Sequence, residues 1–361
     1  MNLKPLFLDI AWNKIKGGDM GKRFIFFIII SLFFNTMVLA APGAQLYYHQ
    51  GHLCDQIVFY CPQQLSVVHG KTNFRQNGRA LVREEYVIKG CLISSDEVMH
   101  ALGRINGNGT YCRVTKGADG RIKLVFKYDP TQVTISRHDF ESIQRSKGIV
   151  FMVEKKNKMV PRTSSKPVIA LDCGHGGKDF GTTGIGGVLE KDLALAIGKK
   201  VERVLRKQGY VVNMTRNDDR FISLDNRTTK ANKGQADLFL SLHINYSPRQ
   251  EVSGIETFCC NGNLYAPKVK MFAQKDSQSA GLGEAIQQSV VQTVRQKHSL
   301  NDRRCKRSVS QVLMGTQMPS ALIELGFCSN PQESARLNSV AYQELLAQGI
   351  SKGIHQYLKQ I

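Results

Sequence analysis

The sequence is short of acidic side chains, and it has no paired-cysteine motif and no apolar run long enough to span a membrane comfortably. Its 361 residues include 49 lysines and arginines against 29 aspartates and glutamates, a formal net charge of +20. No cysteines are spaced as Cys-x-x-Cys, so a structural zinc ribbon is not indicated. Neither a collagen-like repeat nor a long disordered tract is evident. With 42% hydrophobic and 22% charged residues, the composition is that of a folded globular protein.

Residues 1–40 are expected to form a signal peptide. Lys22 and Arg23 precede the apolar run Phe24–Phe34, and Val38-Leu39-Ala40 ends in a small residue. This order is typical of a secretory signal, and the apolar run is shorter than the ~20 residues of a membrane span. An uncleaved membrane anchor is the alternative, and no other association with a membrane is expected. Export argues against a cytosolic role in nucleic-acid binding for the basic charge, and no nucleic-acid-binding signature is present.

The first half of the exported chain has the pattern of a small β-rich domain. Within residues 45–155, β-branched and aromatic runs such as Ile122–Tyr128 alternate with turns rich in Gly and Asn. One short helix is expected at Ser95–Arg104. Residues 156–166 are polar, basic and bounded by proline, which predicts a linker.

Residues 167–361 have a different pattern, in which short apolar runs alternate with helical spacing. Val168–Leu171 is typical of a buried parallel strand, and Glu190–Gln208 carries an apolar helical stripe that ends at Gly209. The alternation predicts an α/β domain with a mostly parallel sheet and helices on both faces. Further strands are expected at Tyr210–Met214, Leu238–His243, Gly254–Cys259 and Ala321–Leu325, and further helices at Asp225–Lys233, at Gly281–His298 and from Tyr342.

Four polar residues mark the ends of these elements. His175, His243 and Glu324 lie at or just after apolar runs, and Glu190 begins a helix after a glycine-rich loop. Two imidazoles and one carboxylate with an open position for water form the ligand set of a catalytic zinc site. A further carboxylate would serve as general base.

Each of the four residues also has a simpler explanation. His175 fits a turn histidine, His243 a hydrogen-bonded core histidine, and Glu190 a helix-capping acid. Glu324 is different, because a carboxylate in so apolar a strand is costly unless it is paired, protonated or bound to metal.

Five motifs follow one another in this half of the chain. They are Asp172-Cys173-Gly174-His175-Gly176-Gly177, Leu189-Glu190-Lys191-Asp192, Thr215-Arg216 with Arg227 and Ala231-Asn232, Ser241-Leu242-His243-Ile244-Asn245, and Met318–Phe327 with Ser329-Asn330-Pro331. In this order they resemble the zinc-dependent N-acetylmuramoyl-L-alanine amidase family, type 3, over the span from Val168 to Ile361.

The resemblance implies a peptidoglycan hydrolase that cuts the amide between the lactyl group of N-acetylmuramic acid and L-alanine of the stem peptide. His175, Glu190 and His243 would hold one zinc ion, and Glu324 would be the catalytic carboxylate. No other cofactor and no protein regulator is indicated. The β-rich half is similar to the targeting domains (AMIN-like) that often precede such amidases in Gram-negative bacteria, which implies a periplasmic location.

The sequence leaves several roles open. Cys173 stands where the family usually has proline, and we expect it to be structural rather than a ligand. Asn245 is expected either to act near the substrate or to be a structural residue at a strand end. Arg303 and Arg304 either contact peptide carboxylates or lie in a solvated basic loop. Two other functions remain as alternatives, namely a non-catalytic cell-wall-binding module and a zinc carboxypeptidase that acts on the stem peptide.

Overall fold

A computed structural model describes residues 45–49, 54–61, 66–89, 110–117, 121–141, 147–155, 165–261, 270–308 and 310–360. The expected signal peptide, the expected helix Ser95–Arg104 and most of the expected linker lie outside these ranges. Among the described helices, none combines the length and the apolar character that crossing a membrane requires.

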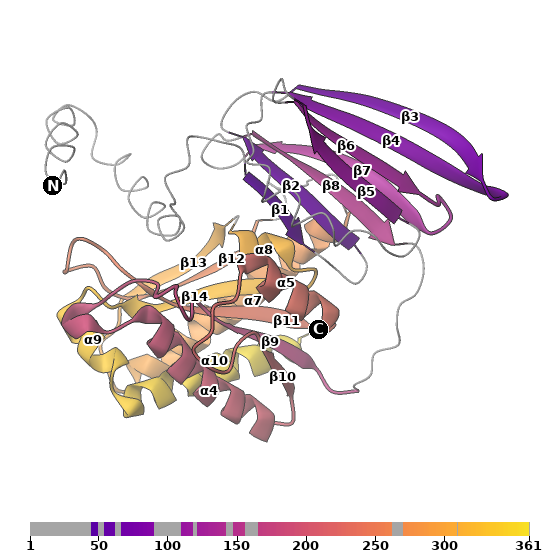
Figure 1. Cartoon of the computed structure of the whole chain (residues 1–361). Coiled ribbons are helices and arrows are strands. Elements are labelled where there is room, and N and C mark those ends of the chain that lie inside the picture. The colour runs from indigo at the N-terminus through magenta and orange to yellow at the C-terminus, as the bar shows by residue number, and fades with distance from the viewer. Residues whose placement is uncertain are drawn as a thin grey trace, which may run out of the picture. The chain divides into compact units, whose positions relative to one another are not determined.

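The N-terminal half consists of two four-stranded antiparallel sheets, as the β-rich prediction requires (Figure 1). Aromatic side chains from both sheets, among them Phe59, Phe126 and Phe151, form their shared core. The first sheet has the order β1 (Gln45–His49), β2 (Cys54–Cys61), β8 (Lys147–Lys155), β7 (Val133–Glu141). The second has the order β3 (Ser66–Gln76), β4 (Arg79–Lys89), β6 (Ile122–Tyr128), β5 (Thr110–Lys116).

The C-terminal half is built on a six-stranded sheet. Neighbouring strands run parallel except for one antiparallel pair, β12 with β14, so the prediction of a mostly parallel sheet is confirmed. The strands in spatial order are β10 (Val211–Met214), β9 (Val168–Cys173), β11 (Leu238–Asn245), β14 (Ser320–Phe327), β12 (Ile255–Cys260) and β13 (Asp302–Ser308).

Helices pack on both faces of this sheet, and alternate strand residues divide between the two sides. Leu240 and Leu242 of β11 face a core with α4 (Glu190–Lys207), α7 (Lys270–Arg295) and α10 (Val340–Leu358). Phe239 faces the opposite core, which contains Ala231 and Leu313. These last two residues belong to the shorter helices α5 (Leu224–Lys233) and α8 (Gln311–Gly315). A seven-residue helix, α9 (Pro331–Leu337), follows β14.

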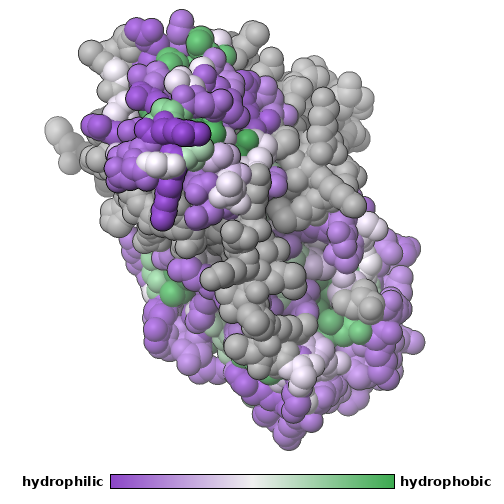
Figure 2. Space-filling view, turned by 90° about the vertical axis from the view of Figure 1, so that its right-hand side faces the viewer, coloured by the Kyte–Doolittle hydropathy of each residue, from purple (hydrophilic) through white to green (hydrophobic). Residues whose placement is uncertain are grey.

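The described residues on one face of the molecule are mainly polar. On the face drawn in Figure 2, hydrophilic residues predominate and hydrophobic ones appear in small separate groups. The large hydrophobic residues that are exposed include Phe180, Phe221 and Tyr246. Many more hydrophobic side chains are buried in the cores of the sheets.

Cys173 lies inside the core between the sheet and α4. Its side chain is fully buried, and a Cβ atom placed on Gly198 of α4 would lie only 2.3 Å from its sulfur. Burial raises the pKa of the Cys173 thiol to about 12. The thiol thus fills the space that a glycine leaves in the facing helix, as a structural residue does.

This contact predicts opposite effects for two glycine substitutions in helices. Gly198→Ala is expected to lower the free energy of unfolding by about 1–3 kcal/mol, because the new methyl group overpacks a filled core. In Gly281→Ala of α7, the new Cβ atom meets only Tyr357, at 3.7 Å. This substitution is expected to raise the free energy of unfolding by about 0.5–1 kcal/mol. Denaturant titration of the full chain measures both. Adding Cys173→Ala to Gly198→Ala should recover most of the loss, and no recovery would contradict the contact.

Candidate metal centre

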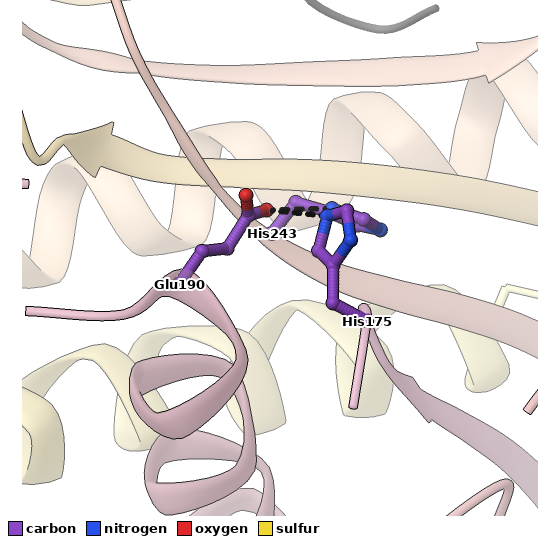
Figure 3. A group of neighbouring side chains, drawn as sticks. All are labelled: His175, Glu190 and His243. Carbon is purple, nitrogen blue, oxygen red and sulfur yellow. Dashed lines mark hydrogen bonds and ion pairs between the residues drawn. The ribbon is translucent and has the colours of Figure 1, made fainter. Parts of the chain in front are cut away.

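Three side chains from separate elements meet at one end of the sheet. His175 follows β9, His243 lies near the end of β11, and Glu190 is the first residue of α4 (Figure 3). Glu190 Oε1 lies 2.8 Å from His243 Nδ1 and 3.2 Å from His175 Nε2. The two imidazole rings are edge to face, with centroids 4.9 Å apart. The structure thus brings together the three residues that the sequence selected as ligands, within 4.8 Å of one another.

The backbone that presents His175 is held by two buried arginines. His175 has φ 58°, a left-handed conformation that is uncommon for residues other than glycine. Arg216 donates to the carbonyls of Cys173 and Gly174 at 2.9 and 2.7 Å. Arg227 donates to the carbonyls of Cys173 and His175 at 2.7 and 2.6 Å. These bonds fix three successive peptide groups and so support the unusual backbone.

Arg227 is fixed in turn by a buried ion pair with Asp172. Its Nη1 lies 2.7 Å from Asp172 Oδ1, and the carboxylate also accepts from Thr215 and Ser241 at 2.6 Å each. Burial alone would raise the pKa of Asp172, but Arg227 and the two hydroxyls hold it below its usual value. The aspartate that opens the first motif therefore anchors the loop rather than contributing to the cluster.

Two glycines allow the cluster to close. A Cβ atom on Gly174 would lie 2.4 Å from the His243 ring. One on Gly181, whose φ is 67°, would lie 2.5 Å from Glu190 Oε2 and 2.7 Å from the His175 ring. Any side chain at either position would displace a member of the cluster.

Glu190 is a buried carboxylate with several donors around it. It is 3% exposed, and it accepts from the amides of Thr182 at 2.8 Å and Ile244 at 3.1 Å. Burial alone would raise the pKa of Glu190, but His175 and His243 together outweigh it and hold the pKa well below its usual range. The carboxylate is therefore charged, and it requires a positive partner, which a proton on an imidazole or a metal cation supplies.

A second carboxylate lies beside the other ring nitrogen of His175. Asp179 Oδ2 lies 2.9 Å from His175 Nδ1. Burial alone would lower the pKa of His175, but Glu190 and Asp179 raise it to about 10. The bond to Asp179 leaves Nε2 directed at Glu190, and this is how proteins commonly orient a histidine that binds a metal. Sequence reasoning missed Asp179, although its position four residues after His175 was a signal.

Glu324 lies on the strand next to His243. The two residues are register partners between β14 and β11. Glu324 is 3% exposed, and its Oε2 has no hydrogen-bond partner among the described residues. Burial, with Glu190 and Glu256 nearby, raises the pKa of Glu324 well above its usual value. A buried acceptor without a partner is unusual in a native structure, and it is consistent with a group that acts on something bound beside it.

The sequence left the roles of Asn245, Arg303 and Arg304 open, and the structure shows different surroundings for them. Asn245 donates from Nδ2 to Glu256 at 2.8 Å and accepts at Oδ1 from the Tyr246 amide at 2.8 Å. Both the nitrogen and the oxygen of its side chain are therefore hydrogen-bonded within the protein. Arg303 and Arg304 lie in strand β13 rather than in a loop. Arg303 lies beside Glu256, with its Nε 3.1 Å from Oε2, whereas Arg304 is 82% exposed. Glu256 was not selected from the sequence.

The sequence matches the N-acetylmuramoyl-L-alanine amidase family over residues 169–356. The uncharacterized protein YqiI of Bacillus subtilis is 35% identical over 192 residues, which cover 53% of this chain and 85% of that protein. The N-acetylmuramoyl-L-alanine amidase AmiA of Escherichia coli is 30% identical over 224 residues, covering 54% of this chain and 78% of AmiA. The crystal structure of an N-acetylmuramoyl-L-alanine amidase from Clostridium difficile 630 aligns with 34% identity and a TM-score of 0.49 over 54% of this chain and 98% of that one.

The family match covers more than half of the chain, and it includes all four residues that the sequence placed in the site. The chain belongs to the N-acetylmuramoyl-L-alanine amidase family.

Proposed function

We propose that this protein is a zinc-dependent N-acetylmuramoyl-L-alanine amidase, which hydrolyses the amide between the lactyl group of N-acetylmuramic acid and L-alanine in peptidoglycan. One observation carries the assignment of the residues. Two imidazole nitrogens and a carboxylate oxygen converge beside Glu324, a buried carboxylate with an oxygen that lacks a partner. Family membership supports the reaction, and the named amidases among the relatives do not favour the wall-binding or carboxypeptidase alternatives.

The donor set fits zinc. Bonds of about 2.0–2.2 Å to a tetrahedral zinc ion would separate neighbouring ligand atoms by about 3.3 Å, and the two short contacts of Glu190 measure 2.8 and 3.2 Å. His175 Nε2, Glu190 Oε1 and His243 Nδ1 would hold the ion and leave a fourth position open. When bound, zinc lowers the pKa of a water molecule to about 7 and polarises a carbonyl group.

Glu324 would move the proton. As general base, its carboxylate takes a proton from the water that attacks the lactyl carbonyl carbon. It then delivers this proton to the nitrogen of L-alanine as the carbon–nitrogen bond breaks. The products are the free lactyl carboxylate and an intact stem peptide with a new amino terminus. Burial raises the pKa of Glu324 above its usual value, which strengthens its carboxylate as a proton acceptor once it is ionised.

The sequence suggests a role for each part of the chain. Residues 1–40 would direct export, residues 45–155 would target the enzyme within the cell wall, and residues 167–361 would carry the chemistry. The basic composition suits an anionic polymer as a partner. A Gram-negative periplasm is the location that these roles imply.

Substituting the general base tests the assignment of Glu324. Glu324→Gln keeps the shape of the side chain but removes its ability to take a proton, so the rate is expected to fall by about 10²–10⁴-fold. Mass spectrometry of purified muropeptides measures the release of intact peptides that begin with L-alanine. The wild type should release them with zinc and stop when a chelator is added.

The metal content provides the control for this variant. Glu324→Gln should retain one zinc per chain, whereas His243→Ala should lose the metal and the activity together. If Glu324→Gln released peptides at the wild-type rate, the carboxylate would not be the base. Release of D-alanine alone by the wild type would point instead to a carboxypeptidase.

The bond from Asp179 predicts a weaker metal site in Asp179→Asn. Loss of a carboxylate behind a metal-binding histidine typically lowers metal affinity by about 10–100-fold. Competition with a fluorescent zinc chelator measures this change. Asp218→Asn is the matched control, because Asp218 is an exposed carboxylate that pairs with Arg220 instead. Equal zinc affinity of Asp179→Asn and the wild type would remove Asp179 from the site.

A further inference from the structure

A third carboxylate continues the row of His243 and Glu324 across the sheet. Glu324 is the register partner of His243 on one side and of Glu256 on the other. Facing residues of neighbouring strands point to the same side of a sheet, so the three side chains share the face opposite α4, α7 and α10. The row leads from the metal cluster towards the edge strand β13.

Glu256 is fully buried, and hydrogen-bond donors and cations compensate the negative charge of its carboxylate. Its relative exposure is 0%, and Oε1 accepts from Asn245 at 2.8 Å. Its Oε2 accepts from Arg303 Nε at 3.1 Å and also from Lys306 Nζ. A buried carboxylate needs such partners, but two cations exceed one anion. The cluster of Glu256, Arg303 and Lys306 therefore carries one positive charge in excess.

Arg303 keeps unused hydrogen-bond donors. Only its Nε is bonded to Glu256, and its guanidinium carbon lies 5.0 Å from the ring centre of Phe327. Among the residues that the structure describes, none accepts a hydrogen bond from its two terminal nitrogens. The side chain is 19% exposed, so these nitrogens are within reach of a solute. A guanidinium that is bonded only through Nε can use its two terminal nitrogens to bind a carboxylate through two hydrogen bonds.

The separation along the row matches two residues of an extended peptide. Neighbouring strands lie about 4.8 Å apart, which places Glu256 about 10 Å from His243 across the sheet. Two extended residues span about 7 Å, and a hydrogen bond adds about 3 Å. A peptide cut at the metal cluster would thus reach Glu256 with its second residue, and Arg303 Nε lies 3.1 Å from Glu256 Oε2.

We propose that Arg303, oriented by Glu256, binds a free carboxylate on the second residue of the stem peptide and makes the enzyme selective for peptides that carry it. The proposal rests on the proposed amidase function and adds a specificity residue to it. Arg304 has no such part, because its side chain is 82% exposed and pairs with Asp302 at 3.5 Å.

Two synthetic substrates test this selectivity. Both are N-acetylmuramoyl dipeptides with L-alanine first, and the second residue carries a free α-carboxylate in one and the primary amide in the other. For the wild type, kcat/KM is expected to be at least about tenfold higher for the acid. Arg303→Gln should reduce kcat/KM for the acid to the level of the amide and leave the amide nearly unchanged. Arg303→Lys keeps the positive charge but lacks the paired terminal nitrogens, so it should give an intermediate ratio of kcat/KM for the acid to kcat/KM for the amide.

The ratio of the two kcat/KM values is the decisive readout, because it does not depend on the fraction of active protein. A general loss of structure would lower both values together. Arg304→Gln is the matched control and should keep the wild-type ratio. Equal cleavage of the two substrates by the wild type, or an unchanged ratio in Arg303→Gln, would overturn the proposal. Cleavage of neither substrate by the wild type would overturn the amidase function itself.

Discussion

The buried carboxylate of Glu190 is the constraint on which the site depends. A charged carboxylate inside a protein costs several kcal/mol unless positive partners and hydrogen bonds surround it. Glu190 is 3% exposed and has two backbone amides and two imidazoles around it. A divalent cation between the same three side chains would meet this requirement, and it is the group that we propose for the amide hydrolysis. The same burial that makes the charge of Glu190 costly thus suits its carboxylate to bind a cation.

Much of the surrounding structure keeps His175 and His243 in reach of this carboxylate. Asp172 and the two arginines Arg216 and Arg227 secure the loop behind His175, and glycines stand where a side chain would separate the cluster. The parallel strands set His243 beside Glu324, and the antiparallel strand β12 adds Glu256 to the same row. A change in any of these supports would move the members of the cluster without altering their own side chains. The fold therefore serves the site through backbone bonds as much as through its hydrophobic core.

The sequence predicted five of the six strands of the C-terminal sheet and its longer helices, and it selected all three members of the cluster. The short helices α8 and α9 were not predicted, although both bury apolar side chains. Strand β13 was missed, because Asp302–Ser308 is polar and only partly buried at the edge of the sheet, and its pairing depends on backbone bonds to β12. Helix α7 begins at Lys270 rather than near Gly281, since Lys275 is anchored by the carbonyls of Leu313 and Thr316, a tertiary contact without a local signal. Asp179 and Glu256 escaped notice for a related reason. Their importance arises from what they bond to in space, and a short polar loop or a single acid in a strand does not reveal that.

The coordination of the bound metal tests the central claim most directly. Zinc K-edge X-ray absorption on the loaded protein would report the ligand atoms around the ion. The account predicts only nitrogen and oxygen ligands at about 2.0–2.2 Å, with the signature of two imidazoles and no sulfur. A sulfur ligand at about 2.3 Å would show that a cysteine enters the site, and a single imidazole would remove one of the two histidines. Either result would contradict a site made of His175, Glu190 and His243.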